Sequence, residues 1–336
     1  MITRLRILGF GIALLAFAGC GGGGGGGGGD PVVTPPPSED VTITSANAVA
    51  VASDVYISIG DAASLGDFGA GGLIGAAGPA SPTLSKSAAT LATKSGITGS
   101  AETGSLIAAV FGPEQSPCAV SGSVTVSGDI QDPQTLSSGD TITLRFNNCD
   151  DGDGQVVNGS LTMTIDTVSG DLNTQFFALG VTLRFQSLSV LELGETTLVN
   201  GSVSMLVDST DYPVTVASLS SPSLSVTSGG QTATLSNYDT TVRVDESSQP
   251  PAFSLTSSGR VDLPTQGGAV TYTVRAPFTG FGDSDPDAGV LFIRGANNAS
   301  ITLTVQSATQ LQLEMDYDGN GSVDETVVLT WVEFET

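Results

Sequence analysis

The feature that most constrains the fold is an alternation of apolar and polar side chains that recurs from about residue 117 to the C-terminus. Such alternation places apolar side chains on one face of an extended strand and polar ones on the other. Threonine and serine fill most polar positions, as suits solvent-facing strands. The alternating apolar sets are Ile142, Leu144 and Phe146; Leu161, Met163 and Ile165; Val181, Leu183 and Phe185; Val203, Met205 and Val207; Ile301, Leu303 and Val305; and Leu311, Leu313 and Met315.

Turn residues recur at short intervals between these sets, which favours antiparallel strands over βαβ units. We therefore predict an all-β domain over residues 111–336, built as one large antiparallel sheet that is curled, closed into a barrel or folded as a sandwich. Residues 41–110 are rich in Gly, Ala and Ser and are expected to form a short helical or irregular segment before it. Within that segment we predict a helix over Ser45–Ile59, N-capped by its first residue, then loop over 60–105 with at most one more helix near Pro82–Lys94.

One segment of the sequence recurs: Val157–Asp166 (VNGSLTMTID) is echoed by Val199–Asp208 (VNGSVSMLVD). Both copies contain Asn-Gly, the pair that favours a type I′ hairpin turn because both central residues take positive φ. The sequence therefore predicts a hairpin turn at each Asn-Gly. Duplication of a hairpin unit and chance convergence of two similar hairpins are both open explanations.

The first twenty residues are organised like a secretory signal. Arg4 and Arg6 precede an apolar run, Ile7–Ala18, whose length of about a dozen residues is too short to span a bilayer core of ~30 Å. The run ends in Phe17-Ala18-Gly19-Cys20, which resembles the lipobox of bacterial lipoproteins, with Phe17 where leucine is usual. The resemblance implies that residues 1–19 are removed and that Cys20 becomes a lipid-bearing N-terminus that anchors the protein to a membrane.

Residues 20–40 are expected to form a tether. Consecutive glycines, Gly21–Gly29, form a flexible coil, and the Pro-rich stretch Asp30–Asp40 is a stiffer spacer. Gly21 stands where an aspartate would resemble the inner-membrane retention signal of lipoproteins. The resemblance therefore implies a bacterial outer-membrane lipoprotein that faces either the periplasm or the cell surface.

Two cysteines remain beyond Cys20, namely Cys118 and Cys149. An even pair in an exported protein favours one disulfide. Two free buried thiols are the alternative. A metal site is disfavoured there because the chain has no histidine to join two soft ligands.

Composition excludes several classes of function. The chain has 10 Lys and Arg against 34 Asp and Glu, a formal net charge of −24. It therefore cannot neutralise a nucleic-acid backbone or dock on anionic lipid through a basic patch. The lack of histidine removes Ser-His-Asp and Cys-His catalysis and His-containing zinc sites.

The best candidate for a ligand site is Asp316–Glu325 (DYDGNGSVDE). It follows the EF-hand type of calcium loop, with oxygen ligands at positions 1, 3, 5 and 9, glycine at 6 and a backbone carbonyl at 7. Position 12 is Val327 in place of glutamate, and the flanks alternate as strands, so we expect a hairpin with a weak Ca²⁺ site. A polar turn that binds nothing is the alternative. The predicted ligands are Asp316, Asp318, Asn320, Ser322 and Asp324.

Other acidic and aromatic residues are expected to be structural. Asp150–Gly154 and Asp283–Asp287 are predicted solvated turns, which would form an acidic rim with the calcium loop if all three met at one end of the sheet. Trp331 is expected in a strand, at a core or edge position, and a binding platform is the alternative. Core packing is also expected of four phenylalanines, with the lining of a cavity in the curled sheet as the alternative: Phe176, Phe177, Phe278 and Phe281.

These observations predict a non-catalytic, membrane-anchored envelope lipoprotein that acts as an interaction or structural module toward a protein or envelope partner. The first alternative is a carrier whose curled sheet holds an acyl chain or another apolar ligand. The second is a carboxylate-based hydrolase acting on glycans, which would need two acids held about 5–10 Å apart.

Overall fold

The computed structural model describes residues 39–73, 111–131, 137–152, 154–172, 174–192, 194–228, 231–282 and 284–335. These residues belong to one compact unit, Glu39–Thr336. The predicted signal peptide, Cys20 and the tether as far as residue 38 lie outside the described residues, as does the helix predicted near Pro82–Lys94.

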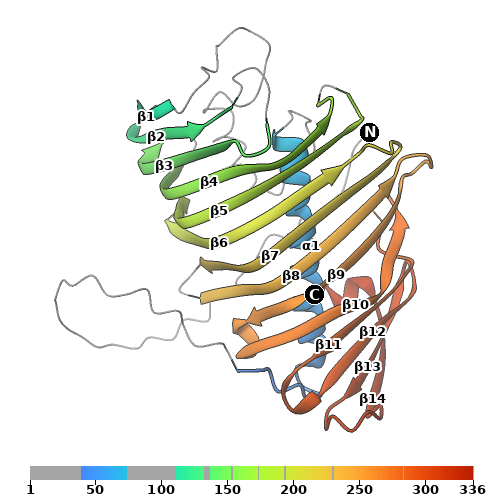
Figure 1. Ribbon diagram of the computed structural model, residues 1–336. Coiled ribbons are helices and arrows are strands. Elements are labelled where there is room, and N and C mark those ends of the chain that lie inside the picture. The colour runs from blue at the N-terminus through green and yellow to red at the C-terminus, as the bar shows by residue number, and fades with distance from the viewer. Residues whose placement is uncertain are drawn as a thin grey trace, which may run out of the picture. The chain divides into compact units, whose positions relative to one another are not determined.

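The described strands form one antiparallel sheet of fourteen strands, in which each strand pairs with the next along the chain (Figure 1). The predicted all-β fold with a large curled antiparallel sheet is confirmed. Hairpins that follow odd-numbered strands lie at one end of the sheet and those that follow even-numbered strands lie at the other. The strands are β1 (Phe111–Pro117), β2 (Ser121–Asp129), β3 (Thr141–Asp150), β4 (Gln155–Gly170), β5 (Phe177–Glu192), β6 (Glu195–Asp208), β7 (Val214–Ser228), β8 (Gln231–Asp245), β9 (Ala252–Leu263), β10 (Gly268–Phe281), β11 (Ala288–Arg294), β12 (Ser300–Ser307), β13 (Gln310–Asp316) and β14 (Glu325–Thr330).

The alternating apolar residues form rows across one face of the sheet, called here the inner face. Leu144 of β3 pairs with Leu161 of β4, which pairs with Phe185 of β5, so the apolar positions of successive strands are in register. The opposite, outer face carries hydroxyl side chains such as those of Thr143 and Thr162, whose Oγ1 atoms lie 3.1 Å apart. Burial on the inner face supplies the main stabilisation of the sheet.

Both Asn-Gly pairs lie inside strands, Asn158-Gly159 in β4 and Asn200-Gly201 in β6, so the predicted hairpin turns are wrong. Each Asn Oδ1 instead accepts a backbone N–H from the neighbouring strand at 2.7 Å, that of Asn148 or Ser187. These two donors have positive φ, and the register shifts beside them, as at β-bulges. The glycine permits close approach, because a Cβ on Gly159 would lie 2.1 Å from the Ser187 carbonyl oxygen. The repeated sequence thus holds two bulges, which bend the sheet.

Helix α1 (Ala48–Leu73) packs on the inner face against β6–β9 and β12 (Figure 1). Its side chains Val51, Ala52 and Val55 are 0% exposed. The helix begins at Ala48 and not at the predicted N-cap, because the Thr44 N–H donates to Asn47 Oδ1 and folds a turn ahead of it.

The helix also continues beyond Ile59 to Leu73, through residues predicted as loop. Helix formation is cooperative, so turns fixed by packing on the sheet can extend into a stretch whose glycines are individually unfavourable. Composition alone therefore placed the end of the helix too early.

The C-terminal residues complete the core. Trp331–Phe334 form a short helix, α3, and not the predicted strand, because Thr330 and Glu333 make a capping box that ends β14. Trp331 is buried, and its ring centroid lies 5.1 Å from that of Tyr56 in α1. The Tyr56 ring also contacts Phe278 of β10 and Phe334 of α3, so these aromatics join the helix to β10 and to the residues that follow β14.

Two of the four phenylalanines predicted to be in the core are exposed. Phe177 and Phe278 are buried, whereas Phe176 and Phe281 are 54% and 49% exposed. The exposed pair lies at strand ends, where alternation no longer fixes which way a side chain points.

Candidate functional site

The predicted calcium loop joins β13 to β14 and is organised by one carboxylate. Asp316, the last residue of β13, is 8% exposed. Its Oδ1 accepts the backbone N–H of Gly319 at 2.8 Å and that of Asn320 at 3.2 Å, and its Oδ2 accepts that of Gly321 at 2.7 Å. Asp316 therefore folds the loop back over its own side chain.

The other predicted ligands shape the same loop. Asp318 Oδ1 accepts the Asn320 N–H at 3.1 Å, and Asn320 Oδ1 accepts the Ser322 N–H at 2.7 Å. Asp324 Oδ2 accepts the Tyr317 N–H at 2.7 Å, which closes the base of the hairpin. The contacts of Asp318 and Asn320 are local Asx-type contacts, which favour tight turns in short acidic segments.

Three of the five predicted ligands bring their charges together. One carboxylate oxygen from each of Asp316, Asp318 and Asp324 lies within 4.8 Å of the other two. Asn320 and Ser322 lie in the same loop, with Asn320 engaged by its hydrogen bonds to the turn. A set of oxygen ligands this close matches the preference of a hard cation such as Ca²⁺.

Glu325 also contributes to the loop, although the sequence pattern did not single it out. Its Oε2 accepts the Tyr317 hydroxyl at 2.7 Å. Burial of the phenol, together with this carboxylate, raises the pKa of Tyr317 to about 12. The contact fixes the Tyr317 ring across the base of the hairpin.

The loop is seated against the turn between β11 and β12, the 3₁₀ turn Ala296–Asn298. Gly319 has a φ of +72°, and a Cβ there would lie 2.3 Å from the Asn297 carbonyl oxygen. A side chain at this position would therefore lift the loop from the turn. Asn297 and Asn298 themselves have positive φ, so both surfaces of this contact are built from tight turns.

A groove of about 370 Å³ runs beside the loop on the outer face of β10–β13. Two arginines, Arg275 and Arg294, line it together with Phe292, and Asp316 lines it from the loop. Sequence reasoning missed this groove. Two features of the sequence could have pointed to it. Arginine is scarce in the chain, and Arg275 and Arg294 both occupy polar positions in neighbouring alternating segments.

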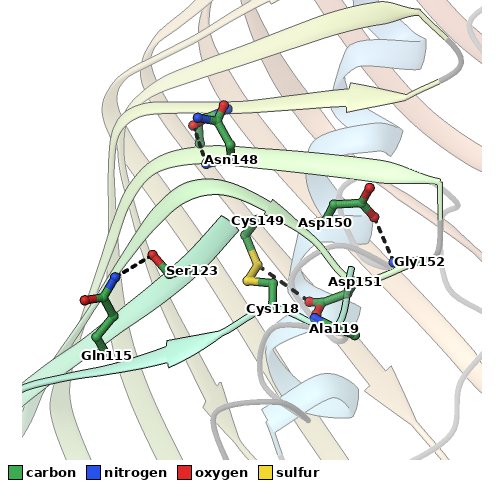
Figure 2. Close-up of a disulfide and its surroundings, with 10 residues drawn as sticks. Gln115, Cys118, Ala119, Ser123, Asn148, Cys149, Asp150, Asp151 and Gly152 are labelled. Carbon is green, nitrogen blue, oxygen red and sulfur yellow. Dashed lines mark hydrogen bonds between the residues drawn. A yellow bond between two sulfur atoms is a disulfide. The ribbon is translucent and has the colours of Figure 1, made fainter. Parts of the chain in front are cut away.

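The other acidic loops have structural roles in the described residues. Asp151 Oδ1 accepts the Ala119 N–H at 2.8 Å, and Asp150 Oδ1 accepts the Gly152 N–H at 2.8 Å (Figure 2). Asp287 accepts the Thr279 hydroxyl, and partial burial raises the pKa of Asp285.

The three acidic loops do not meet at one end of the sheet, which was the condition for an acidic rim. The loops after β3 and β13 lie at one end of the sheet, whereas the loop after β10 lies at the other. The order of the strands alone separates them, and that order is not visible in the sequence.

The predicted disulfide between Cys118 and Cys149 is present (Figure 2). It joins the turn after β1 to the end of β3. Asp151 lies close to both sulfur atoms, but sulfurs consumed in a disulfide are not thiolate ligands for a metal. Cys118, Cys149 and Asp151 therefore form a structural disulfide with a neighbouring carboxylate and not a metal site.

Comparisons of the chain with protein-family profiles, with curated proteins and with solved structures found no match. Within the described ranges, no helix is long and apolar enough to cross a bilayer.

Proposed function

We propose that the protein is a non-catalytic, lipid-anchored interaction module of the bacterial envelope whose last hairpin binds Ca²⁺. The observation that carries the proposal is the convergence of Asp316, Asp318 and Asp324 within 4.8 Å on one short loop. The groove on the outer face opens beside that loop, so an ion there would sit next to the surface that a partner can reach.

The physical argument for calcium is electrostatic. Carboxylates this close repel one another, and a divalent cation with oxygen ligands relieves the repulsion. Asp318 and Asp324 are exposed, so water can complete the coordination. Without a glutamate at position 12 the site is expected to be weak, with a Kd of about 10⁻⁴–10⁻³ M, as in extracellular modules.

The envelope location rests on the lipobox-like Phe17-Ala18-Gly19-Cys20 and on the tether that follows it. A disulfide in the domain is compatible with an oxidising compartment outside the cytosol. Cys20→Ser should release the protein from the membrane fraction, and an unchanged distribution would contradict lipid anchoring. Protease treatment of intact cells then separates a surface-facing domain, which is cut, from a periplasmic one, which is not.

A carrier of acyl chains is the second candidate function. It is favoured by the continuation of the apolar inner face over β3–β5, beyond β6–β9 where α1 packs. Native mass spectrometry of the purified protein tests it, because a carrier should retain lipid from the cell. Absence of bound lipid would leave the interaction module as the better account.

Thermal unfolding in calcium tests the proposed site. With a Kd of about 1 mM, Ca²⁺ at about 10 mM should add about 1.4 kcal/mol of stability, which raises the Tm by a few degrees. Asp318→Ala should abolish this rise. The matched control is Asp211→Ala, in the exposed turn after β6 at the opposite end of the sheet; it should retain the full rise. An equal rise in both variants would remove the loop as the binding site.

A further inference from the structure

A cluster of two arginines and one phenylalanine lies on the outer face of β10 and β11. The guanidinium Cζ of Arg275 lies 3.5 Å from the ring centroid of Phe292, and that of Arg294 lies 5.8 Å from it. The pairing of Thr273 with Phe292 and of Thr271 with Arg294 places these positions on the same face. Both guanidinium groups are thus held over one ring, as cation–π contact favours.

Neither arginine is neutralised by a carboxylate of the described residues. Two other arginines of the sheet are paired with carboxylates: Arg243 Nη2 lies 3.6 Å from Asp245 Oδ2, and Arg260 binds Asp40. In a chain with a net charge of −24, acidic partners are abundant. Two arginines that contact the same Phe292 ring and form no ion pair with a described residue therefore place unpaired positive charge at one position on the outer face.

The groove beside the cluster offers further hydrogen-bonding groups. Its lining includes Asn298, Ser300 and Thr302. Two acids, Asp316 and Glu314, also line it; Asp316 accepts three backbone N–H groups, and Glu314 Oε1 accepts the Gln312 amide at 2.9 Å. Both carboxylates keep their negative charge, so the charged groups that can donate to a ligand in the groove are the two guanidinium groups.

We propose that this groove binds a compact oxyanion, a carboxylate or a phosphate group, between Arg275 and Arg294. A guanidinium presents N–H donors in a planar fork that matches two oxygens of either group. Stacking on Phe292 restricts the side chains before a ligand arrives, which lowers the entropy lost on binding. The inference rests on the proposed function as a binding module and deepens it by naming the ligand as acidic.

Calcium should strengthen binding of the oxyanion without being required for it. Asp316 belongs both to the acidic loop and to the lining of the groove. A divalent cation at the loop would offset negative charge that repels an anionic ligand. Affinity measured in EDTA and in Ca²⁺ therefore separates the two proposals: binding in EDTA depends on the arginines alone, and an increase in Ca²⁺ depends on the loop as well.

The test is a titration of the full chain followed by NMR of the arginine side-chain N–H groups. The probes are inorganic phosphate and D-glucuronate, with D-glucose as the uncharged control. We expect at least one of the two acidic probes to shift the NMR signals of Arg275 and Arg294 in EDTA, whereas glucose should leave both signals unchanged. Shifts with phosphate alone identify a phosphate-bearing ligand, and shifts with glucuronate alone identify a carboxylate.

Variants keep the test specific. Arg275→Gln and Arg294→Gln should each weaken binding by about tenfold or more, because each removes a charge-assisted contact. Arg184→Gln, an exposed outer-face arginine on β5, is the matched control and should leave the affinity unchanged. The inference is overturned if neither acidic probe shifts the two signals, or if Arg184 responds equally. If the acidic probes bind in EDTA but Ca²⁺ does not raise their affinity, the calcium proposal is contradicted and the oxyanion proposal stands.

Discussion

Single residues fix the loops and ends of this sheet through local hydrogen bonds. At the N-cap of α3, the Thr330 N–H and hydroxyl both donate to Glu333 Oε2 at 2.8 Å. These contacts lower the pKa of Glu333 from its ordinary value of 4.5, and the hydrogen bond from the Thr330 backbone N–H has the larger effect. A lowered pKa means that the ionised cap stabilises the fold above about pH 4.5 and that this contribution is lost as the pH falls through the folded-state pKa.

The cap predicts a specific pH dependence. The Glu333 carboxyl ¹³C signal should titrate with a midpoint below 4.5. Thr330→Val removes the hydroxyl donor and keeps the backbone N–H, so the midpoint should move part of the way back toward the ordinary value. A midpoint that is the same in both proteins would show that the hydroxyl does not hold the carboxylate.

The two parts of the candidate site differ in how far they could be predicted. Asp316, Asp318 and Asp324 are close in the chain, so local turn chemistry brings them together and the sequence pattern finds them. Arg275 lies over the Phe292 ring only because β10 and β11 pair in one particular register, whereas Arg294 is two residues from Phe292 on β11 itself. Alternation assigns each arginine to the polar face of its strand, but it does not state which residue lies opposite.

At the scale of elements, the disulfide stabilises the first strands of the sheet. Cys118 and Cys149 are separated by 31 residues and join the turn after β1 to β3. Among the described strands, β1 is the first in the sheet order and pairs only with β2, so it lacks the second strand neighbour that holds the inner strands. Edge strands of this kind depend on such additional restraints.

Removal of the disulfide should therefore lower stability. In Cys118→Ser/Cys149→Ser, the free energy of unfolding by urea should fall by about 3–4 kcal/mol, the chain-entropy value for a loop of this length. Amide hydrogen exchange should quicken first in β1 and β2. Alkylation of the unreduced wild type should leave both cysteines unlabelled, and quantitative labelling would show that the bond is not formed in solution.

Sequence predicted the kinds of element better than their boundaries. The strands around Leu144, Leu161 and Leu313 follow the alternation, because the order of apolar and polar residues within each segment determines which face is buried. The Asn-Gly pairs were assigned to turns, although the same positive-φ preference serves a bulge equally well. The end of α1 was missed because its extension depends on cooperativity and packing on the sheet and not on local composition.

At the scale of the whole described unit, the sequence predicted a large antiparallel sheet but not what covers it. Alternation reports which side chains are buried and leaves open which element buries them. In the structure, α1 lies on the inner face of β6–β9, with Val51 and Val55 fully buried. The candidate site lies on the outer face, where a partner can reach it without displacing the helix.

The proposal that the Asp316–Asp324 loop binds calcium is tested most directly by amide NMR of the full chain titrated with Ca²⁺. We predict shifts in Gly319, Gly321 and Ser322, which surround the three carboxylates, and smaller shifts in Asn298 of the adjoining turn. An unchanged spectrum, or shifts confined to the acidic loops after β3 and β10, would contradict the proposed site.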